Sequence, residues 1–159
     1  MGIEQRIEAL ETRLQAAEDQ LEIIRLINTY GPLVDSGESQ PAAHLWIEGG
    51  VYDMGGVRRA VAYDDIASVY DSDGHRQLIN TGCAHLTATP RITLNGDRAE
   101  AVAYSMVLLK AQDGWNVWRA SANHWTLTRT AEGWRIVERY NRVLDGSEAS
   151  HETLRRVMR

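Results

Sequence analysis

The sequence contains no phenylalanine, one cysteine and three prolines in 159 residues. The single cysteine, Cys83, excludes an internal disulfide and is compatible with a reducing cytoplasm. Aromatic side chains come instead from five tryptophans and six tyrosines, which can fill a core and also present polar tips to a pocket. We therefore expect a cytoplasmic protein in which these aromatic residues serve both purposes.

Long apolar runs and runs of basic residues are missing as well. The N-terminal segment is rich in glutamate and has no apolar stretch of signal-peptide length, and no later stretch approaches a membrane span. The net charge of −5 makes nucleic acids unfavourable partners. The length and ordinary globular composition predict one soluble domain that binds neither membranes nor nucleic acids.

A heptad pattern occupies the N-terminal region. Over residues 3–24, apolar side chains recur at alternating intervals of four and three, with Glu and Arg between them. The apolar set then shifts but keeps helical spacing, which predicts one helix over about residues 3–34, bent or loosened at Pro32. The apolar heptad residues of this helix form a stripe along residues 3–24, called the seam below. The seam packs either on its own domain or against another subunit.

The rest of the chain changes from helical to β-type patterns. Helices are expected over 41–47 and 63–72, with a short strand at 49–56 between them. From Thr81 the period is two, and Pro90 indicates a bulge or a sheet edge in the first long strand. Tight-turn signals such as Asn95-Gly96 separate the long strands, which are expected over 81–94, 98–111, 115–130 and 134–144, before a final helix within 147–159.

This order of elements predicts an α+β fold. Helices should cover the concave face of a curved antiparallel sheet. Such an arrangement leaves a cavity between the two layers, which is a usual place for a small apolar ligand.

Two residues can carry chemistry together. Asp35 follows the apolar end of the long helix and is either a turn former before Ser36-Gly37 or a carboxylate facing a pocket. His85 lies on the first long strand, on the same side as Cys83. A carboxylate at the end of a covering helix and a histidine on the sheet can meet in one cavity, where the carboxylate fixes the imidazole tautomer and stabilises the imidazolium. Cys83 itself is interpreted as a small buried side chain rather than a nucleophile.

Motifs for other chemistries are missing from the sequence. The five histidines are far apart, and no metal-ligand spacing, phosphate-binding glycine loop or serine-nucleophile elbow is present. We therefore expect neither a metal nor a cofactor.

Three stretches carry a family resemblance: "LINTYGPLVDSGE", "HLTATPRITL" and "EGWRIVERYNRVLDG". They resemble the SnoaL-like branch of the NTF2-like superfamily, and within it the lyase subgroup of bile acid 7α-dehydratase, hexachlorocyclohexane dehydrochlorinase and scytalone dehydratase. The resemblance extends from about Glu4 to Gly146. It implies a cone-shaped α+β barrel, a single domain over residues 1–159, and a homo-oligomer that is a trimer rather than a dimer.

The resemblance also implies roles for individual residues. Asp35 and His85 match the Asp–His dyad of the family, with His85 as the base. Tyr30 matches a tyrosine that donates to a departing or carbonyl oxygen, and Arg142 matches an arginine that stabilises negative charge. A second histidine used by scytalone dehydratase has no evident counterpart, although His75 lies in a suitable region. The residues expected to shape the pocket are Tyr52, Trp125 and Cys83.

The resulting prediction is a cofactor-independent lyase that eliminates water or another small group from a hydrophobic, cyclic small molecule. Two alternatives stay open. One is an isomerase of the ketosteroid isomerase type, in which the abstracted proton returns elsewhere on the substrate. The other is a non-catalytic protein of the same fold that binds a small molecule or acts as a structural subunit.

Overall fold

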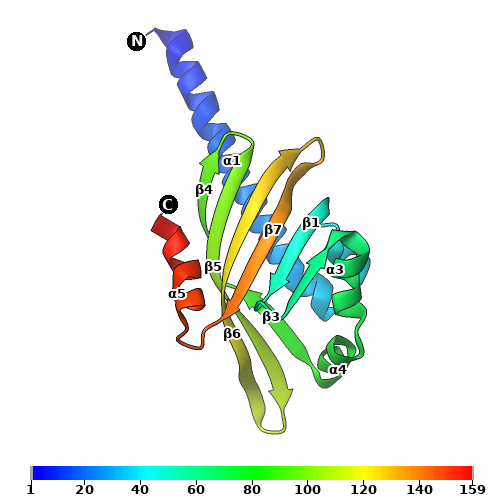
Figure 1. The fold of residues 1–159 in the computed structure, drawn as a ribbon. Helices are drawn as coiled ribbons and strands as arrows, with labels where there is room; N and C mark the ends of the chain where they lie inside the picture. Colours follow the sequence, from blue (N-terminus) through cyan, green and yellow to red (C-terminus); the bar gives the residue numbers. More distant parts are fainter. Residues whose placement is uncertain (1, 159) are drawn as a thin grey trace.

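The structure is a computed structural model that describes residues 2–158 (Figure 1). Its helices are α1 (Ile3–Asp35), α2 (Ser39–Ala43), α3 (Ala62–Asp71), α4 (Asp73–Thr81) and α5 (Glu148–Arg155), followed by a short 3-10 helix (Arg156–Met158). Its strands are β1 (Trp46–Met54), β2 (Arg58–Val61), β3 (Cys83–Thr87), β4 (Arg91–Asn95), β5 (Arg98–Ala111), β6 (Gly114–Thr130) and β7 (Gly133–Val143).

The strands form one curved sheet in the order β2-β1-β7-β6-β5-β3, with β4 also paired to β5. The α+β prediction is confirmed, but the sheet is mixed, because β1 runs parallel to β7. The four predicted long strands do form an antiparallel meander. The sheet remains open between β2 and β3 and does not close into a barrel, and the helices pack on both of its faces (Figure 1).

Local sequence features explain where the predicted elements agree with the structure and where they differ from it. The first long strand is interrupted around Pro90, as predicted, and its two halves, β3 and β4, both pair with β5. Gly96 and Gly114 have positive φ at the two predicted hairpin turns, where a side chain would be strained. The sequence prediction omitted β2 and α4 and began the second helix and the first strand too late.

The core lies between α1 and the inner face of the sheet. Ile23, Ile27 and Val34 of α1 are buried there against tryptophans from the sheet, including Trp125 and Trp134. This apolar spacing of three and four places one face of the helix on the sheet. The helix continues through Pro32 to Asp35, so its final turn reaches the sheet edge at β3.

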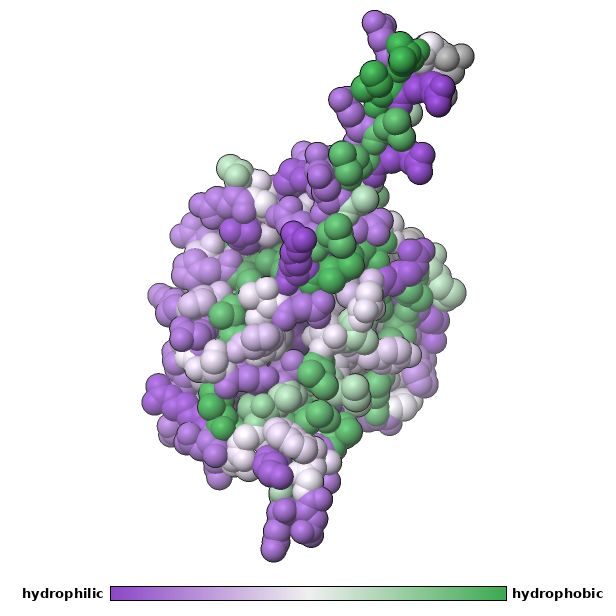
Figure 2. Space-filling model, turned by 180° about the vertical axis from the view of Figure 1, so that it is seen from behind, coloured by the Kyte–Doolittle hydropathy of each residue, from purple (hydrophilic) through white to green (hydrophobic). Residues whose placement is uncertain are grey.

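The N-terminal part of α1 extends beyond the sheet (Figure 1). Figure 2 shows apolar side chains along this extension, and the heptad residues at its start are exposed. The alternative in which the whole seam packs on its own domain is therefore wrong. Within residues 2–158, no helix is both long enough and apolar enough to cross a membrane.

Candidate active site

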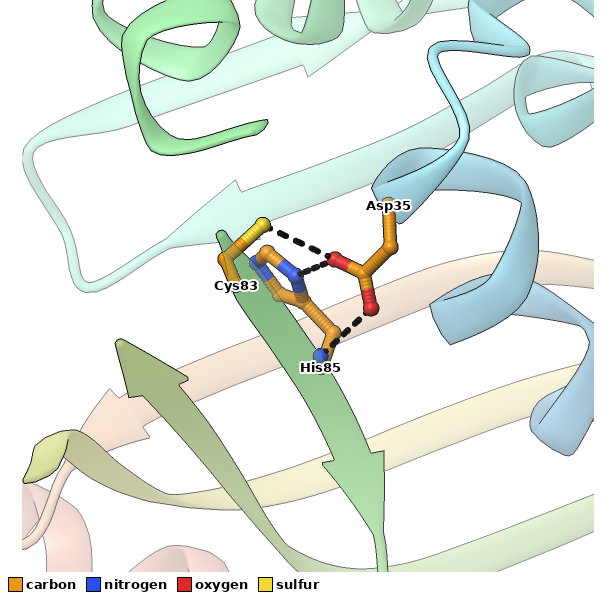
Figure 3. Close-up of side chains that lie close together, drawn as sticks. All are labelled: Asp35, Cys83 and His85. Atoms are coloured by element: carbon orange, nitrogen blue, oxygen red, sulfur yellow. Dashed lines mark hydrogen bonds and ion pairs between the residues drawn. The ribbon is translucent and has the colours of Figure 1, made fainter. Parts of the chain in front are cut away.

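Asp35 and His85 meet where the end of α1 crosses β3 (Figure 3). Oδ1 of Asp35 lies 2.5 Å from Nδ1 of His85, and the backbone amide of His85 donates to Oδ2 of Asp35 at 2.7 Å. The thiol of Cys83 donates to Oδ1 of Asp35 at 3.2 Å. One carboxylate thus accepts three hydrogen bonds from a single strand, which holds the imidazole ring in place.

These contacts determine the charges of the cluster. Burial alone would raise the pKa of Asp35, but the hydrogen bonds from the His85 ring and amide outweigh it and lower the pKa below its usual value. The carboxylate is therefore ionised at neutral pH, and Nδ1 of His85 is the donor. Burial and the neighbouring Asp35 raise the pKa of Cys83 to about 12, so its thiol keeps its proton. Cys83 therefore acts as a donor to Asp35.

Gly31 allows the helix to come this close to the strand. A Cβ atom at this position would lie 2.1 Å from the backbone oxygen of His85. Any other residue would push α1 away from β3, one turn before the residue that holds the imidazole. The glycine in "TYGPLVD" is therefore a packing requirement of the dyad, which the sequence prediction did not recognise.

A cavity of about 350 Å³ opens beside the dyad. His85 and Tyr30 line it, and their rings meet edge to face with centroids 6.2 Å apart. His75 lies beside His85, with centroids 5.6 Å apart, and its Nε2 donates to the carbonyl of Val34 at 2.9 Å. The residues lining the cavity are Tyr30, Tyr52, Met54, Val69, Tyr70, Ser72, Gly74, His75, Leu78, His85, Trp118 and Arg119.

A buried arginine lies behind the tyrosines of the cavity. The guanidinium of Arg139 lies over the rings of Tyr30 and Tyr52, 4.3 and 4.8 Å from their centroids. Its Nε donates to Asn123 at 3.0 Å. The predicted pocket residue Tyr52 therefore lines the cavity, whereas Trp125 is buried beneath Arg139, 5.5 Å from its guanidinium, and supports the site from the core.

Arg142 lies elsewhere, although the resemblance implies a role for it in the pocket. It is ion-paired with Asp53 at 2.5 Å and lies over the ring of Tyr140. The cause is a register shift in the pairing of β6 with β7, at which Val137 is an extra residue. Such a bulge reverses the alternation that follows it, so Arg139 faces inward and Arg142 outward.

Several residues at the cavity were not predicted from the sequence. Tyr70 lines it, and the hydroxyl of Tyr70 is buried with no hydrogen-bond partner among residues 2–158. Trp118 and Arg119 come from β6, next to another register shift, and the strand pattern alone gives no signal for them. For His75 there was a signal, because the family resemblance already indicated the region of the chain in which it lies.

The dyad cluster also has the composition of a metal site. Asp35, Cys83 and His85 each offer a ligand atom, and these atoms lie within 4.8 Å of one another. In the structure the same atoms are joined by hydrogen bonds to the carboxylate. The arrangement is thus suited to holding and moving a proton.

Comparisons with known proteins agree with this fold. The chain is 41% identical to an NTF2-like protein with a cystatin-like fold from Novosphingobium aromaticivorans, over 91% of this chain and 94% of that one, with a TM-score of 0.89. Two more distant structures share the fold: a putative aromatic ring hydroxylase from the same organism (23% identity, 80% and 90% coverage, TM-score 0.65) and ActVI-ORFA from Streptomyces coelicolor (19%, 80% and 98%, 0.70). A search of curated proteins found no match. Because the SnoaL-like domain matches residues 15–140, most of the chain, the protein belongs to the SnoaL-like family.

Proposed function

We propose that the protein is a cofactor-independent lyase of the dehydratase type that acts on a hydrophobic, cyclic small molecule. The observation that carries this proposal is the 2.5 Å contact between Asp35 and His85 at the wall of a cavity. A histidine oriented by an ionised carboxylate is an effective general base. Membership of a family that includes polyketide cyclases and dehydratases supports the same class of chemistry.

His85 would act as the base. In the neutral imidazole, a hydrogen on Nδ1 that is donated to Asp35 leaves Nε2 as the nitrogen able to accept a proton from a substrate carbon. The imidazolium that forms is stabilised by the negative charge of Asp35. The elimination is then balanced: the C–H electron pair forms the new double bond, and the leaving group departs with its own bonding pair.

Hydroxyl groups on the cavity wall would assist the leaving group. Tyr30 faces His85, and a tyrosine hydroxyl there can donate to the departing oxygen or to a carbonyl that activates the C–H bond. Burial raises the pKa of Tyr70, so its unpartnered hydroxyl also stays a donor. Tyr30 lies on α1 and Tyr70 on α3, and their rings meet edge to face with centroids 5.9 Å apart.

The charge of the wall favours a substrate with an electron-rich oxygen. None of the residues that line the cavity within the described chain is an aspartate or glutamate, whereas Arg119 and two histidines are present. Arg119, rather than Arg142, is therefore placed to stabilise negative charge that develops on the substrate. The remaining wall is mostly apolar and aromatic, which suits a ring-containing molecule, and its volume is within the range of ligand pockets.

The test is turnover of cyclic β-hydroxy carbonyl compounds, followed by mass spectrometry for the loss of water. We expect His85→Ala and Asp35→Asn to lower turnover by at least about a hundredfold, because general-base catalysis contributes that much or more. His151→Ala is the matched control, because His151 is exposed on α5. Full turnover by a folded His85→Ala variant would refute the mechanism.

The same assay in D₂O separates elimination from isomerisation. A lyase yields a product lighter by one water molecule. An isomerase yields a product with the mass of the substrate, apart from deuterium taken up from the solvent. The second outcome would retain the roles of Asp35 and His85 and overturn the assignment as a lyase.

A further inference from the structure

The N-terminal half of α1 has no part in the proposed site. Its apolar seam is exposed along its length: Ile3 is 76% exposed, Ile7 50%, Leu10 58%, Leu14 58% and Leu21 53%. Figure 2 shows apolar side chains along the projecting helix. Contiguous exposed apolar surface of this kind marks an interaction site. The seam is therefore a candidate surface for a partner.

The helix attaches to its own domain through a different face. Asp19 forms an ion pair with Arg129 at 2.6 Å and accepts a hydrogen bond from the Trp134 indole, and Ile23 is fully buried. If Leu14 occupies heptad position a, Asp19 falls at f and Ile23 at c, both away from the a/d seam. The anchored face thus turns the seam outward and leaves it available to a partner.

The charges beside the seam restrict which helix can pair with it. In the same heptad register, the e positions are Glu4, Glu11 and Glu18, and Arg6 and Arg13 occupy g positions; all five are exposed. In a parallel coiled coil, each g residue faces the following e residue of the other helix, so Arg6 meets Glu11 and Arg13 meets Glu18 of a second copy. An antiparallel pair would place arginine against arginine and glutamate against glutamate.

We propose that residues 3–24 form a parallel, in-register coiled coil with the same segment of other copies of this chain. The pattern is self-complementary in this orientation alone, so no foreign helix is needed to explain it. Leucine at a with isoleucine at d favours assemblies of more than two strands. Leu14 and Leu21 at a with Ile3 and Ile24 at d follow this combination, whereas Ile7 at a with Leu10 at d is the combination of two-stranded coils, so the proposal leaves the number of strands open.

The assembly is tested by the mass of the full chain in solution, measured by light scattering across a dilution series. We expect a multiple of 17.8 kDa for the wild type and the single-chain mass for Leu10→Glu/Leu14→Glu. The control Gln5→Glu/Ala9→Glu adds the same charge to exposed positions outside the seam and should keep the wild-type mass. Near-UV circular dichroism confirms that the domain of each variant is folded.

The orientation is tested by cross-linking. In the parallel coil the Ile3 side chains of neighbouring copies share one layer, so Ile3→Cys should form an intermolecular disulfide under mild oxidation. In an antiparallel coil they would lie roughly 30 Å apart, the length of the seam, far beyond the reach of a disulfide. Wild-type protein treated in the same way controls for Cys83.

Three results would overturn the proposal. They are a wild-type mass of one chain, an assembly that survives Leu10→Glu/Leu14→Glu, and an assembled Ile3→Cys variant that does not cross-link. None of them depends on the enzymatic activity, so the lyase proposal and the coiled-coil proposal can fail separately.

Discussion

Replacing Gly31 by alanine is the most direct test of how the dyad is held. The new methyl group would lie 2.1 Å from the backbone oxygen of His85, whereas an ordinary contact is at least 3.4 Å. The opposing atom is a backbone carbonyl, which cannot rotate away as a flexible side chain can. Either α1 or β3 must therefore move, and either movement shifts the carboxylate of Asp35 on α1 relative to the imidazole of His85 on β3.

The expected change in the free energy of unfolding follows from two opposing effects. Overpacking a well-packed interior costs about 1–3 kcal/mol, and a clash with backbone belongs at the upper end. Alanine in place of glycine within a helix returns about 1 kcal/mol. The free energy of unfolding should therefore fall by about 2 kcal/mol, which corresponds to about 4–8 °C in Tm for a domain of this size.

Gly74→Ala is the matched control for this substitution. Gly74 also lies in a helix, but an added Cβ there meets nothing within 4 Å. Without a clash, the same change should stabilise the protein by about 0.4–1 kcal/mol. Urea unfolding of both variants gives the two free energies. If Gly31→Ala proves as stable as Gly74→Ala, the close approach of α1 to β3 does not hold the dyad.

Three further predictions concern the same cavity. The folded state lowers the pKa of Asp35, so the stability it contributes is present above about pH 4 and lost in acid; the free energy of unfolding should therefore fall less steeply for Asp35→Asn than for the wild type as the pH drops from 5 to 3. The pKa of about 12 predicts that Cys83 reacts with a disulfide reagent at pH 8 far more slowly in the folded than in the unfolded protein, and equal rates would contradict it. Tyr70→Phe removes an unpartnered buried hydroxyl, so it should raise the free energy of unfolding by about 1 kcal/mol and weaken substrate binding; a loss of stability would show that the hydroxyl is hydrogen-bonded in the folded protein.

The sequence predicted the dyad because its two residues carry local signals. Asp35 stands at the end of a helix that is recognisable from its apolar spacing, and His85 lies on a recognisable strand, where alternation shows which residues share its side. When this helix packs on the sheet, only a few arrangements are possible for its C-terminal end and the strand that carries His85. The resemblance supplied the pairing, and the structure gives the distance.

Arg139 and Arg142 show a limit of predicting side-chain direction from the sequence of one strand. Strict alternation from Trp134 along β7 places Arg142 on the inner face and Arg139 on the outer face. The extra residue at Val137 reverses both, and the bulge is visible only in the pairing with β6. Because register belongs to a pair of strands and not to one, a single strand sequence does not reveal which arginine lies behind the cavity.

Helix α1 has three separate roles in this protein, and different parts of its surface serve each of them. Residues 3–24 present a seam to solvent, the face that includes Asp19 and Ile23 anchors the helix on the sheet, and Gly31 lets the last turn deliver Asp35 to His85. An unbroken helix is stiff over this length, so a shift of its anchored part is transmitted to the carboxylate. Assembly through the seam would add contacts to the same helix that positions the base, and would thereby favour the geometry in which Asp35 reaches His85.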